Sequence, residues 1–570
     1  MLIDLKQQTQ NFMKLNILTA FLISLGMGSG VILAETVITL PPLTGDATKA
    51  IQNTIDSISS SIKGESVIIK LSEKSVYHIS RSESLCIPYH ISNTTSFEEN
   101  PDPTKHIGIR FKNLHNVTFD GNGAKIVTHG EMTSFVIDSC ENISLKNFTL
   151  TSADPSVVEI KILEKDDKGF SFEVKPPSEY VADNGRFYFK GEGWVFGDGG
   201  FITRLPQYAQ VFYPDKDVTL RHPYPLKNYS KVEERGKRVV RMDFDKVPDV
   251  HPGEIFQLRH GIRNEAAGFI NRSKDIVLEN IDFNFLGNFG IVGQFSENLT
   301  YDNIRCQPDS ETERTNAGFA DFIQMSGCKG KIVIKNSRFI GSHDDPINIH
   351  GTYLTVTGSD DGHVVTVRYS HAQTFGFQPF IPGDEIEIID RHTLNPVDNV
   401  SRHVTKIEKI DDYTYKINLD KPVPDLPLSC SYEDLAIENI TWTPEVEILN
   451  NYFARTPTRG VLITTRGKSL IEGNTFFRIP MPSILVADDA GSWYESGPVK
   501  DLTIRNNTFI ECSDPVIKIS PEIERYDKPV HRNILIEGNR FIGGSDDFLE
   551  VKGAENVVLK DNIMDSISSL

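Results

Sequence analysis

The chain has 570 residues, 59 of them basic and 78 acidic, with a formal net charge of -19 and a pI near 5.3. This charge excludes the basic face that a nucleic-acid-binding protein needs, and it disfavours docking on anionic lipid. A neutral partner such as a sugar remains allowed. A hydrophobic content of 39% and a mean hydropathy of -0.27 are typical of a globular chain, and the length predicts two or more packing units.

The N-terminal stretch has the features of a secretory signal peptide over residues 1–34. Lys14 precedes an apolar run from Leu15 to Ala34, and a polar sequence starts at Glu35. A basic start, an apolar centre and a small residue before the cleavage point are the marks of such a signal. We therefore expect cleavage after Ala34 and a mature protein that is secreted or periplasmic. An uncleaved membrane anchor is the alternative, because the run is long enough to span a bilayer.

One pattern recurs along the rest of the chain: a short apolar alternation, then Asn, then another apolar residue. It reads NISLKNFTL from residue 142, DIVLENIDF from 275 and DLTIRNNTF from 501. A period in the twenties with two-residue alternation is typical of a solenoid of strands, whose coils bury their inner faces by stacking. The LxxLxL spacing of a leucine-rich repeat is missing. We predict an all-β fold, a right-handed parallel β-helix with an Asn ladder at one turn. The marker Asn recurs after 23 residues in three pairs: Asn280 and Asn303, Asn451 and Asn474, and Asn539 and Asn562.

Two gaps in the repeat are too long for turns, and each must hold an inserted unit. Residues 155–264 and 352–440 contain short alternating strands bounded by Gly, Pro and Asp, the pattern of small antiparallel β-barrel-like domains. Helical spacing over Ala47–Ile62 predicts a helix that caps the N-terminal end of the solenoid, because an exposed coil edge would aggregate. The expected division is 1–34 signal peptide, 35–154 cap and first coils, 155–264 first insertion, 265–351 central coils with the site, 352–440 second insertion, and 441–570 C-terminal coils.

Aligning the coils brings acidic residues together. Residues 320–327 (ADFIQMSG) and 344–351 (DDPINIHG) superpose with an offset of about one coil, so that Asp321 falls on Asp345. Neighbouring strands are about 4.8 Å apart, so these two should be near neighbours with Asp344 beside them. The second insertion starts directly after this strand and is expected to wall a cleft there. The inward stacks should be Ile323, Met325, Ile347, Ile349, Val461 and Ile463. Each coil has a second strand about 15 residues before its marker Asn. Counting back by this spacing extends the column of stacked positions to Glu265, Asn288, Asp321, Asp345, Arg459 and Asp547.

Three carboxyl groups packed this closely raise the pKa of at least one of them. Glycoside hydrolysis uses two carboxyl groups, one protonated to release the leaving group and one ionised. Asp321 and Asp345, if stacked, can hold and deprotonate a water together, and Asp344 then suits the general acid. Strict strand alternation puts Asp344 and Asp345 on opposite faces, so the Gly-Ser-His before them must bend the backbone for both to reach a cleft. The alternative is a solvated turn, which we expect for the same doublet at Asp546–Asp547.

Other side chains near this column could bind the sugar. Gln324, Asn348 and His350 share outward parity beside the aspartates, although laddered polar residues are the common alternative. Arg459 could bind a hydroxyl or hold the carboxylates ionised, with a surface salt bridge as its alternative. Indole rings could stack on a sugar face. The expected substrate-binding residues are Asn288, Gln324, Asn348, His350, Arg459, Trp194 and Trp493.

The cysteines and the known motifs give no sign of a cofactor. The six cysteines form no CxxC pair and lie far apart, so we expect thiols rather than a disulfide framework. The chain has no P-loop, HExxH, GxSxG or EF-hand motif. No metal ion or other cofactor is therefore expected.

These features together resemble glycoside hydrolase family 110, the bacterial α-1,3-galactosidases. The resemblance covers nearly the whole mature chain and is most specific in the core GFADFIQMSG…GSHDDPINIHG. It implies an inverting, metal-independent exo-enzyme that releases terminal α-1,3-linked galactose from glycans or glycoproteins, from the blood group B determinant or from linear structures. It also implies Asp344 as acid and Asp321 with Asp345 as base. A homodimer is an open possibility, and no nucleic-acid partner is expected.

Three rival functions remain open. A polysaccharide lyase needs a basic proton abstractor and often calcium, which an acidic column beside one Arg fits less well. A galacturonan hydrolase also carries a DD pair, but its anionic substrate wants several basic residues, and its GHG segment is missing here. A non-catalytic glycan-binding or tailspike protein does not need Asp321, Asp344 and Asp345 together. Hydrolysis of a chromogenic α-galactoside, with and without EDTA, separates these alternatives.

Overall fold

The computed structural model describes residues 35–61, 66–94, 96–198, 205–423 and 431–567. The predicted signal peptide and Cys430 lie outside these residues. The described cysteines are unpaired thiols, all buried except Cys86. No helix in the described ranges is long and apolar enough to cross a membrane.

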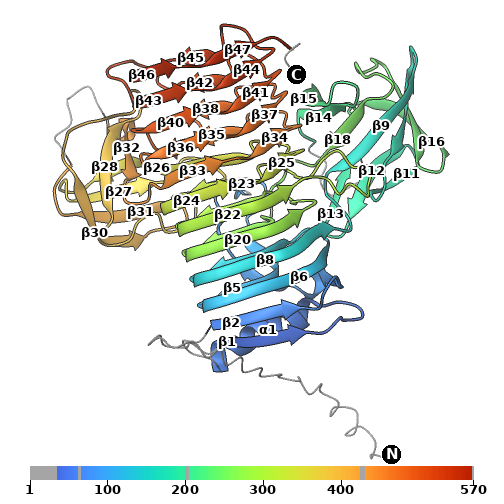
Figure 1. Cartoon of the computed structure of the whole chain (residues 1–570), viewed down its shortest axis with the longest axis horizontal. Coiled ribbons are helices and arrows are strands. Elements are labelled where there is room, and N and C mark those ends of the chain that lie inside the picture. Colours follow the sequence, from blue (N-terminus) through green and yellow to red (C-terminus); the bar gives the residue numbers. More distant parts are fainter. Residues whose placement is uncertain (1–34, 62–65, 95, 199–204, 424–430, 568–570) are drawn as a thin grey trace, which may run out of the picture.

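The main body is a right-handed parallel β-helix, as the repeat predicts, and its coils stack from the blue N-terminal end to the red C-terminal end (Figure 1). Two ladders of parallel strands form one sheet, and a third ladder forms a second sheet. The strands of the first sheet are β1 (Glu35–Leu40), β2 (Ser66–Leu71), β3 (Val76–Ser80), β6 (His115–His129), β8 (Glu141–Ser152), β20 (Lys274–Phe283), β22 (Glu297–Cys306), β24 (Lys329–Lys335), β25 (Arg338–Ile340), β33 (Glu445–Leu449), β34 (Tyr452–Ala454), β36 (Ser469–Glu472), β37 (Thr475–Phe477), β40 (Leu502–Arg505), β41 (Thr508–Ile510), β43 (His531–Glu537), β44 (Arg540–Ile542), β46 (Ala554–Lys560) and β47 (Ile563–Asp565). Those of the third ladder and its edges are β4 (Leu85–Pro88), β5 (Thr104–Lys112), β7 (Thr133–Asp138), β19 (Gly268–Asn271), β21 (Ile291–Gln294), β23 (Ile323–Ser326), the start of β26 (Ile347–Ser359), β35 (Val461–Ile463), β38 (Ile484–Val486), β39 (Glu495–Ser496), β42 (Ile517–Ile519) and β45 (Leu549–Val551).

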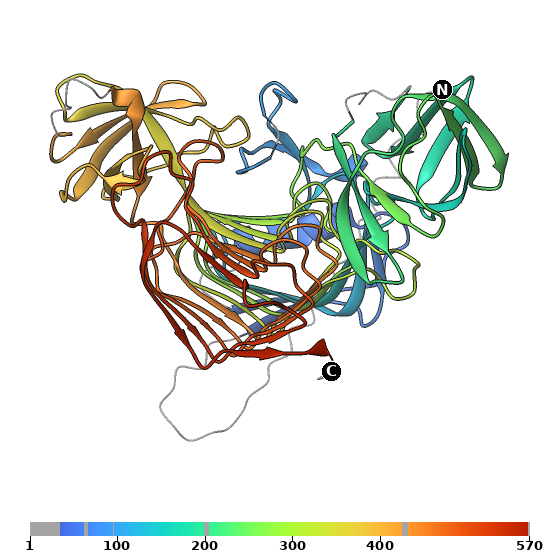
Figure 2. The same cartoon turned by 90° about the horizontal axis from the view of Figure 1, so that it is seen from above.

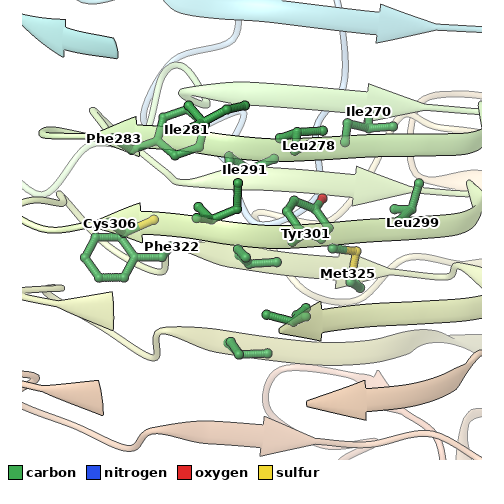
Figure 3. Close-up of a cluster of buried hydrophobic side chains, with 14 of the residues drawn as sticks. Ile270, Leu278, Ile281, Phe283, Ile291, Leu299, Tyr301, Cys306, Phe322 and Met325 are labelled. Atoms are coloured by element: carbon green, nitrogen blue, oxygen red, sulfur yellow. The ribbon is translucent and has the colours of Figure 1, made fainter. Parts of the chain in front are cut away.

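The core runs along the inside of the solenoid. Every second residue of each strand points inward, which is why the alternation in the sequence predicts the fold. Figure 3 shows such inward side chains from successive coils packed against one another. All six residues expected in the inward stacks are fully buried, so that prediction is confirmed. In the C-terminal half, neighbouring coils also stack aromatic rings with centroids 4.7–5.3 Å apart: Phe339, Phe453, Phe476, Phe509 and Phe541.

The Asn ladder is confirmed in the C-terminal coils. Oδ1 of Asn474 accepts hydrogen bonds from the backbone N (2.9 Å) and Nδ2 (3.0 Å) of Asn451, and its own Nδ2 donates to the Ile448 carbonyl (2.8 Å). Each coil's marker thus satisfies backbone groups of its neighbour. The same bonds continue through Asn507, Asn539 and Asn562.

The marker Asn shifts by one position along the solenoid. Arg338 pairs with Tyr452, so Asn336 lies opposite Asn450, and Ser337 takes the ladder position opposite Asn451. Asn336 and Asn450 both have left-handed backbones (φ 54° and 56°), a conformation that Asn tolerates well. Two adjacent turn positions therefore favour Asn for different reasons. The Asn that marks the repeat in the sequence occupies the left-handed position in some coils, as at Asn336, and the ladder position in others, as at Asn451.

The predicted N-terminal helix is present as α1 (Thr48–Ser61). The Asp46 carboxylate accepts a hydrogen bond from the backbone N of Thr48 (2.9 Å), which satisfies one free donor of the first turn. Ile51, Ile55 and Ile58 are buried in the solenoid core, so the helix covers the interior at this end (Figure 1).

Two antiparallel units interrupt the solenoid and flank it on opposite sides (Figure 2). The first inserted unit has a seven-stranded sheet of order β15-β14-β18-β9-β10-β17-β16 and a separate three-stranded sheet. Its strands are β9 (Val158–Lys165), β10 (Gly169–Val174), β11 (Glu179–Asp183), β12 (Arg186–Gly191), β13 (Trp194–Gly197), β14 (Tyr208–Tyr213), β15 (Val218–Pro223), β16 (Tyr229–Gly236), β17 (Val239–Phe244) and β18 (Ile255–Leu258). In the second inserted unit, the far half of β26 joins β27 (Val364–Arg368), β28 (Glu385–Asp390), β29 (Asn395–Pro396), β30 (Arg402–Lys409), β31 (Thr414–Leu419) and β32 (Leu435–Asn439). Because β26 begins in the solenoid, the second unit is a direct continuation of the strand that follows Asp344 and Asp345.

Candidate active site

A pocket of about 300 Å³ lies on the third ladder, and it is lined mainly by residues from consecutive coils. Its volume is at the lower end of the range for ligand pockets, about 300–1,000 Å³. A larger pocket of about 480 Å³ lies in the first inserted unit, but Asp198 is its one carboxylic side chain among the described lining residues. We therefore place acid–base chemistry in the smaller pocket. Its carboxyl groups belong to Asp321, Asp344, Asp345, Asp488, Asp489, Glu495 and Glu522.

The coil alignment that brought the aspartates together is correct in register. Residue Ile323 of β23 pairs with Ile347 of β26, which puts Asp321 beside Asp345 on adjacent rungs. Asp344 also lines the pocket, because residues 341–346 form bends rather than strand. Gly341 makes this bend possible: its φ is +80°, and a Cβ there would meet the Thr315 carbonyl at 2.7 Å. The sequence expectation of a bent backbone before the doublet is thus confirmed.

The neighbouring coil approaches Asp321 very closely. Gly290 lies against the carbonyl oxygens of Asp321 and Phe322, and an added Cβ would overlap with both. Phe289, one residue earlier, lines the pocket and carries the Arg263 guanidinium 4.8 Å above its ring. A glycine at position 290 therefore lets the coil supply an aromatic wall without displacing Asp321.

Arg459 holds Asp345 in a two-point ion pair. Nε of Arg459 donates to Oδ1 at 2.8 Å and Nη2 lies 2.7 Å from Oδ2, and the Asp345 side chain is only 3% exposed. Burial lowers the pKa of the Arg459 guanidinium, but the charge and hydrogen bonds of Asp345 outweigh it, so the pKa is raised above the ordinary value. This two-point pair fixes the orientation of the Asp345 carboxylate in the pocket.

Asp321 is in the opposite situation. Burial raises its pKa well above the ordinary value, the charges of Asp344 and Asp345 raise it further, and Arg263 opposes them. Asp321 is therefore the member of the three that keeps a proton most readily. Asp344 is the most exposed of the three, with a side chain that is 20% exposed, and Nη2 of Arg263 and Nη2 of Arg221 lie 3.3 Å and 3.8 Å from its carboxylate. The site thus combines a carboxyl group that readily keeps its proton with a carboxyl group held in a two-point ion pair, and general acid–base catalysis uses carboxyl groups in such different surroundings.

Asn348 and Trp493, both expected to bind the sugar, line the pocket. Trp493 is 45% exposed, so much of its indole remains available. Gln324 and His350 are brought together, but they are buried and bonded to each other at 2.8 Å (Nε2 to Nε2). Since Nδ1 of His350 donates to the Gly351 carbonyl (2.6 Å), its Nε2 accepts from the Gln324 amide. This pair supports the wall from behind.

Two expected sugar-binding residues are not brought to the pocket. Trp194 is buried in the core of the first inserted unit, among Phe187, Phe189 and Phe196. Asn288 is fully buried and lies beside Ala320 rather than Asp321, because Ile291 pairs with Ile323. The second difference comes from one extra residue in β24: Glu297 pairs with Lys329 but Leu299 pairs with Ile332, so counting back from Asn303 and Asn336 does not reach paired residues. Trp194 was picked for its residue type alone, without any positional evidence.

The second inserted unit does not wall the pocket, contrary to the expectation from its position in the sequence. None of the lining residues comes from the described part of residues 352–440. Instead the first inserted unit supplies Arg221, and the chain leading out of it supplies Arg263. The sequence analysis missed both arginines, since their coil partners cannot be counted from the repeat. A basic residue next to the column, in the segment RHGIRNE, was the available signal.

Within the described residues, no group of three His, Cys, Asp or Glu side chains is arranged to hold a metal ion. The cations of the pocket are instead the three guanidinium groups, and each lies within 4 Å of an aspartate of the site: Arg459 with Asp345, and Arg221 and Arg263 with Asp344.

Comparison with known proteins gives matches over most of the chain. The chain is 45% identical over 509 residues to the alpha-1,3-galactosidase A of Bacteroides thetaiotaomicron, covering 89% of this chain and 87% of that protein. It is 38% identical to the alpha-1,3-galactosidase A of Streptomyces avermitilis over 79% of this chain and 74% of that one. A family model described as GLAA-B beta-barrel domain II matches residues 364–426 in the second inserted unit. Among solved structures, a polygalacturonase from Erwinia carotovora ssp. carotovora matches with a TM-score of 0.35 and 11% identity over 93% of each chain. The chain belongs to glycoside hydrolase family 110, the family of the α-1,3-galactosidases.

Proposed function

We propose that the protein is an exo-acting, inverting α-1,3-galactosidase that releases single galactose residues from the non-reducing ends of glycans. The observation that carries this proposal is the set of three aspartates on adjacent rungs in one pocket of about 300 Å³. A pocket of this size suits one terminal sugar better than a long chain, which supports exo action. The names of the relatives support the linkage.

In the proposed mechanism, Asp345 and Asp321 hold the attacking water and Asp344 protonates the leaving oxygen. Arg459 orients the Asp345 carboxylate through a two-point ion pair, and in this proposal the carboxylate takes the proton of the water. An inverting enzyme needs room for a water between base and sugar, with the acid roughly 6.5–9.5 Å from the base. Asp321 and Asp345 on neighbouring rungs suit one composite base, and Asp344, on the bend, suits the acid.

One observation favours exchanging two of these roles. Asp344 lies near two guanidinium groups, whereas burial and like charges raise the pKa of Asp321, so in the empty site the proton resides on Asp321. The first assignment therefore requires Asp344 to take up a proton when the sugar binds. The alternative makes Asp321 the acid and Asp344 part of the base.

Leaving-group dependence separates the two assignments. A variant that lacks the acid keeps much of its rate on a substrate whose leaving group needs no protonation, such as a dinitrophenyl α-galactoside, whereas a variant that lacks the base does not. If Asp344 is the acid, Asp344→Asn should be rescued by this substrate and Asp321→Asn should not. The reverse pattern would exchange the roles.

The charges of the pocket favour a neutral sugar. Its seven carboxyl groups outnumber its three guanidinium groups, and all three guanidinium groups lie beside carboxylates of the site. The carboxylate of a galacturonate would add a further negative charge to this pocket and would be repelled by its acidic side chains. This supports a galactoside over the galacturonan of the rival hydrolase or lyase, and the acid–base arrangement supports catalysis over simple glycan binding.

The test is hydrolysis of nitrophenyl α-galactoside and of α-1,3-linked galactosyl disaccharide, with and without EDTA. We expect release of galactose from both, unchanged by EDTA, and none from an α-linked galacturonide. Comparison of the branched blood group B structure with linear α-1,3-galactose then gives the glycan preference. Hydrolysis of the galacturonide alone would contradict the proposal.

We also propose export after cleavage behind Ala34 and, as an open alternative to a monomer, a homodimer. N-terminal sequencing of secreted protein and light scattering of the purified protein test these two statements. Material that still contains Lys14 would exclude cleavage.

A further inference from the structure

A short segment with an unusual backbone carries three of the pocket residues, Asp489, Trp493 and Glu495. Trp493 and Glu495 both line the pocket, and Tyr494 between them has φ +60°. A bulky residue rarely adopts this left-handed conformation, and where it does the surroundings must enforce it. We call residues 489–496 the strap.

The strap is fixed at its start by Asp489. The Asp489 carboxylate accepts hydrogen bonds from the backbone N of Gly491 (2.7 Å), Ser492 (2.8 Å) and Trp493. The backbone N of Asp489 in turn donates to the Glu495 carbonyl (3.0 Å), which closes the strap into a loop. At its end, β39 pairs antiparallel with β26 two residues past His350. The strap is therefore a rigid loop rather than a free one.

The second inserted unit holds the strap from outside the pocket. The His371 ring packs on the Trp493 ring with centroids 4.7 Å apart, and Arg391 donates to the Tyr494 hydroxyl at 2.8 Å. Thr374 donates to Asn93 at 2.7 Å, and Asn93 belongs to the pocket wall. The unit thus contacts two wall residues, Trp493 and Asn93, and the neighbouring Tyr494, and none of its described residues lines the pocket.

Glu495 is only half satisfied in this arrangement. Its Oε1 accepts hydrogen bonds from Nδ2 of Asn93 and Nδ2 of Asn348, both at 3.3 Å. Its Oε2 has no hydrogen-bond partner among the described residues, yet it is not one of the buried unpartnered atoms, so it is accessible from the pocket. The charge of Glu495 acts on both Asp321 and Arg459, which puts it next to the reacting groups.

We propose that Oε2 of Glu495 accepts a hydrogen bond from a hydroxyl of the terminal sugar, and that the second inserted unit positions it through His371, Thr374 and Arg391. The proposal rests on the proposed function and names a specificity residue of the same site. A hydroxyl bound to a carboxylate forms a strong, charge-assisted bond, and a sugar without that hydroxyl leaves the carboxylate unpaired.

The test measures galactose binding and kcat/KM for wild type, Glu495→Gln and Glu495→Ala, with Glu445→Gln as the matched control at an exposed position of β33. Glu495→Gln keeps the shape and loses the charge, and we expect weaker galactose binding by at least about 5-fold; Glu495→Ala should weaken it by about 10- to 100-fold. The series of monodeoxygalactoses identifies the hydroxyl: wild type should lose affinity for one of them, and Glu495→Ala should no longer distinguish that one from galactose.

The positioning role of the second inserted unit is tested separately, by the KM and kcat of His371 variants. His371→Ala should raise KM more than it lowers kcat, and His371→Phe, which keeps a ring against Trp493, should restore KM. Failure of wild type to hydrolyse any α-galactoside would overturn the proposed function. An active wild type with Glu495 variants that bind galactose as Glu445→Gln does would overturn the inference alone. Unchanged KM in His371→Ala would remove the positioning role of the second unit.

Discussion

Replacing Asp321 by Asn should make the protein more stable while it removes the activity. Burial and the charges of Asp344 and Asp345 raise the pKa of Asp321 well above its ordinary value. The folded protein therefore keeps this proton at pH values where the unfolded chain, with an Asp pKa of about 3.9, has released it. The unfolded state then binds one proton fewer than the folded state, so the free energy of unfolding falls as pH rises, by about 1.4 kcal/mol per pH unit.

Asn has nearly the same shape and is uncharged in both states, so the variant lacks this dependence. The difference in free energy of unfolding, variant minus wild type, should be smallest near pH 4 and grow by about 1.4 kcal/mol per pH unit until the folded Asp321 ionises. The assay is the Tm of both proteins by scanning calorimetry from pH 4 to pH 8, where 1 kcal/mol corresponds to about 2 °C in a large domain. An Asn variant with a lower Tm at pH 7, or with a Tm difference that does not change with pH, would refute a protonated Asp321.

The remaining predictions concern the other charged groups of the site. Asp344→Asn and Asp345→Asn should each lower kcat on an α-1,3-linked galactosyl disaccharide, whose leaving group needs a proton, by about 10²–10⁴-fold, whereas Asp547→Asn, at an exposed doublet outside the pocket, should leave it unchanged. A fully active Asp345→Asn would remove it from the base. Arg459→Ala leaves a buried carboxylate unpaired and should destabilise the protein by about 3–5 kcal/mol. Arg540→Ala, which breaks a similar but exposed coil-to-coil pair, should cost less than about 1 kcal/mol, and equal losses in thermal unfolding would contradict the burial of the Arg459 pair.

The solenoid could be predicted because its stability depends on a pattern that the sequence repeats. The alternation and the 23-residue period gave the coils, and the offset between residues 320–327 and 344–351 gave the neighbours Asp321 and Asp345, with Arg459 one rung on. These predictions compared segments whose apolar residues superpose directly. Asn288 was reached by counting back from Asn303 across a stretch where β24 has one residue more than β22, and it lies one residue off the column.

Arg221, Arg263 and Glu495, which come from an insertion and from loops, could not be placed from the sequence. Arg221 comes from a strand of the first inserted unit, and the repeat gives no register between that unit and the coils. Glu495 is placed by the bond from the backbone N of Asp489 to its carbonyl and by the pairing of β39 with β26, which the local sequence does not reveal. Such tertiary contacts decide which polar side chains reach the pocket, and a single sequence carries no signal for them.

The central claim, hydrolysis of a terminal α-1,3-linked galactose by a composite base and a separate acid, is tested most directly by proton NMR of the first galactose released. Wild-type protein is mixed with an α-1,3-galactosyl disaccharide, and the anomeric signals are followed before mutarotation mixes them. We expect β-galactose to form first, because water attacks the face opposite the leaving group. Initial α-galactose would contradict the account, since it would require an aspartate of the pocket to act as a nucleophile.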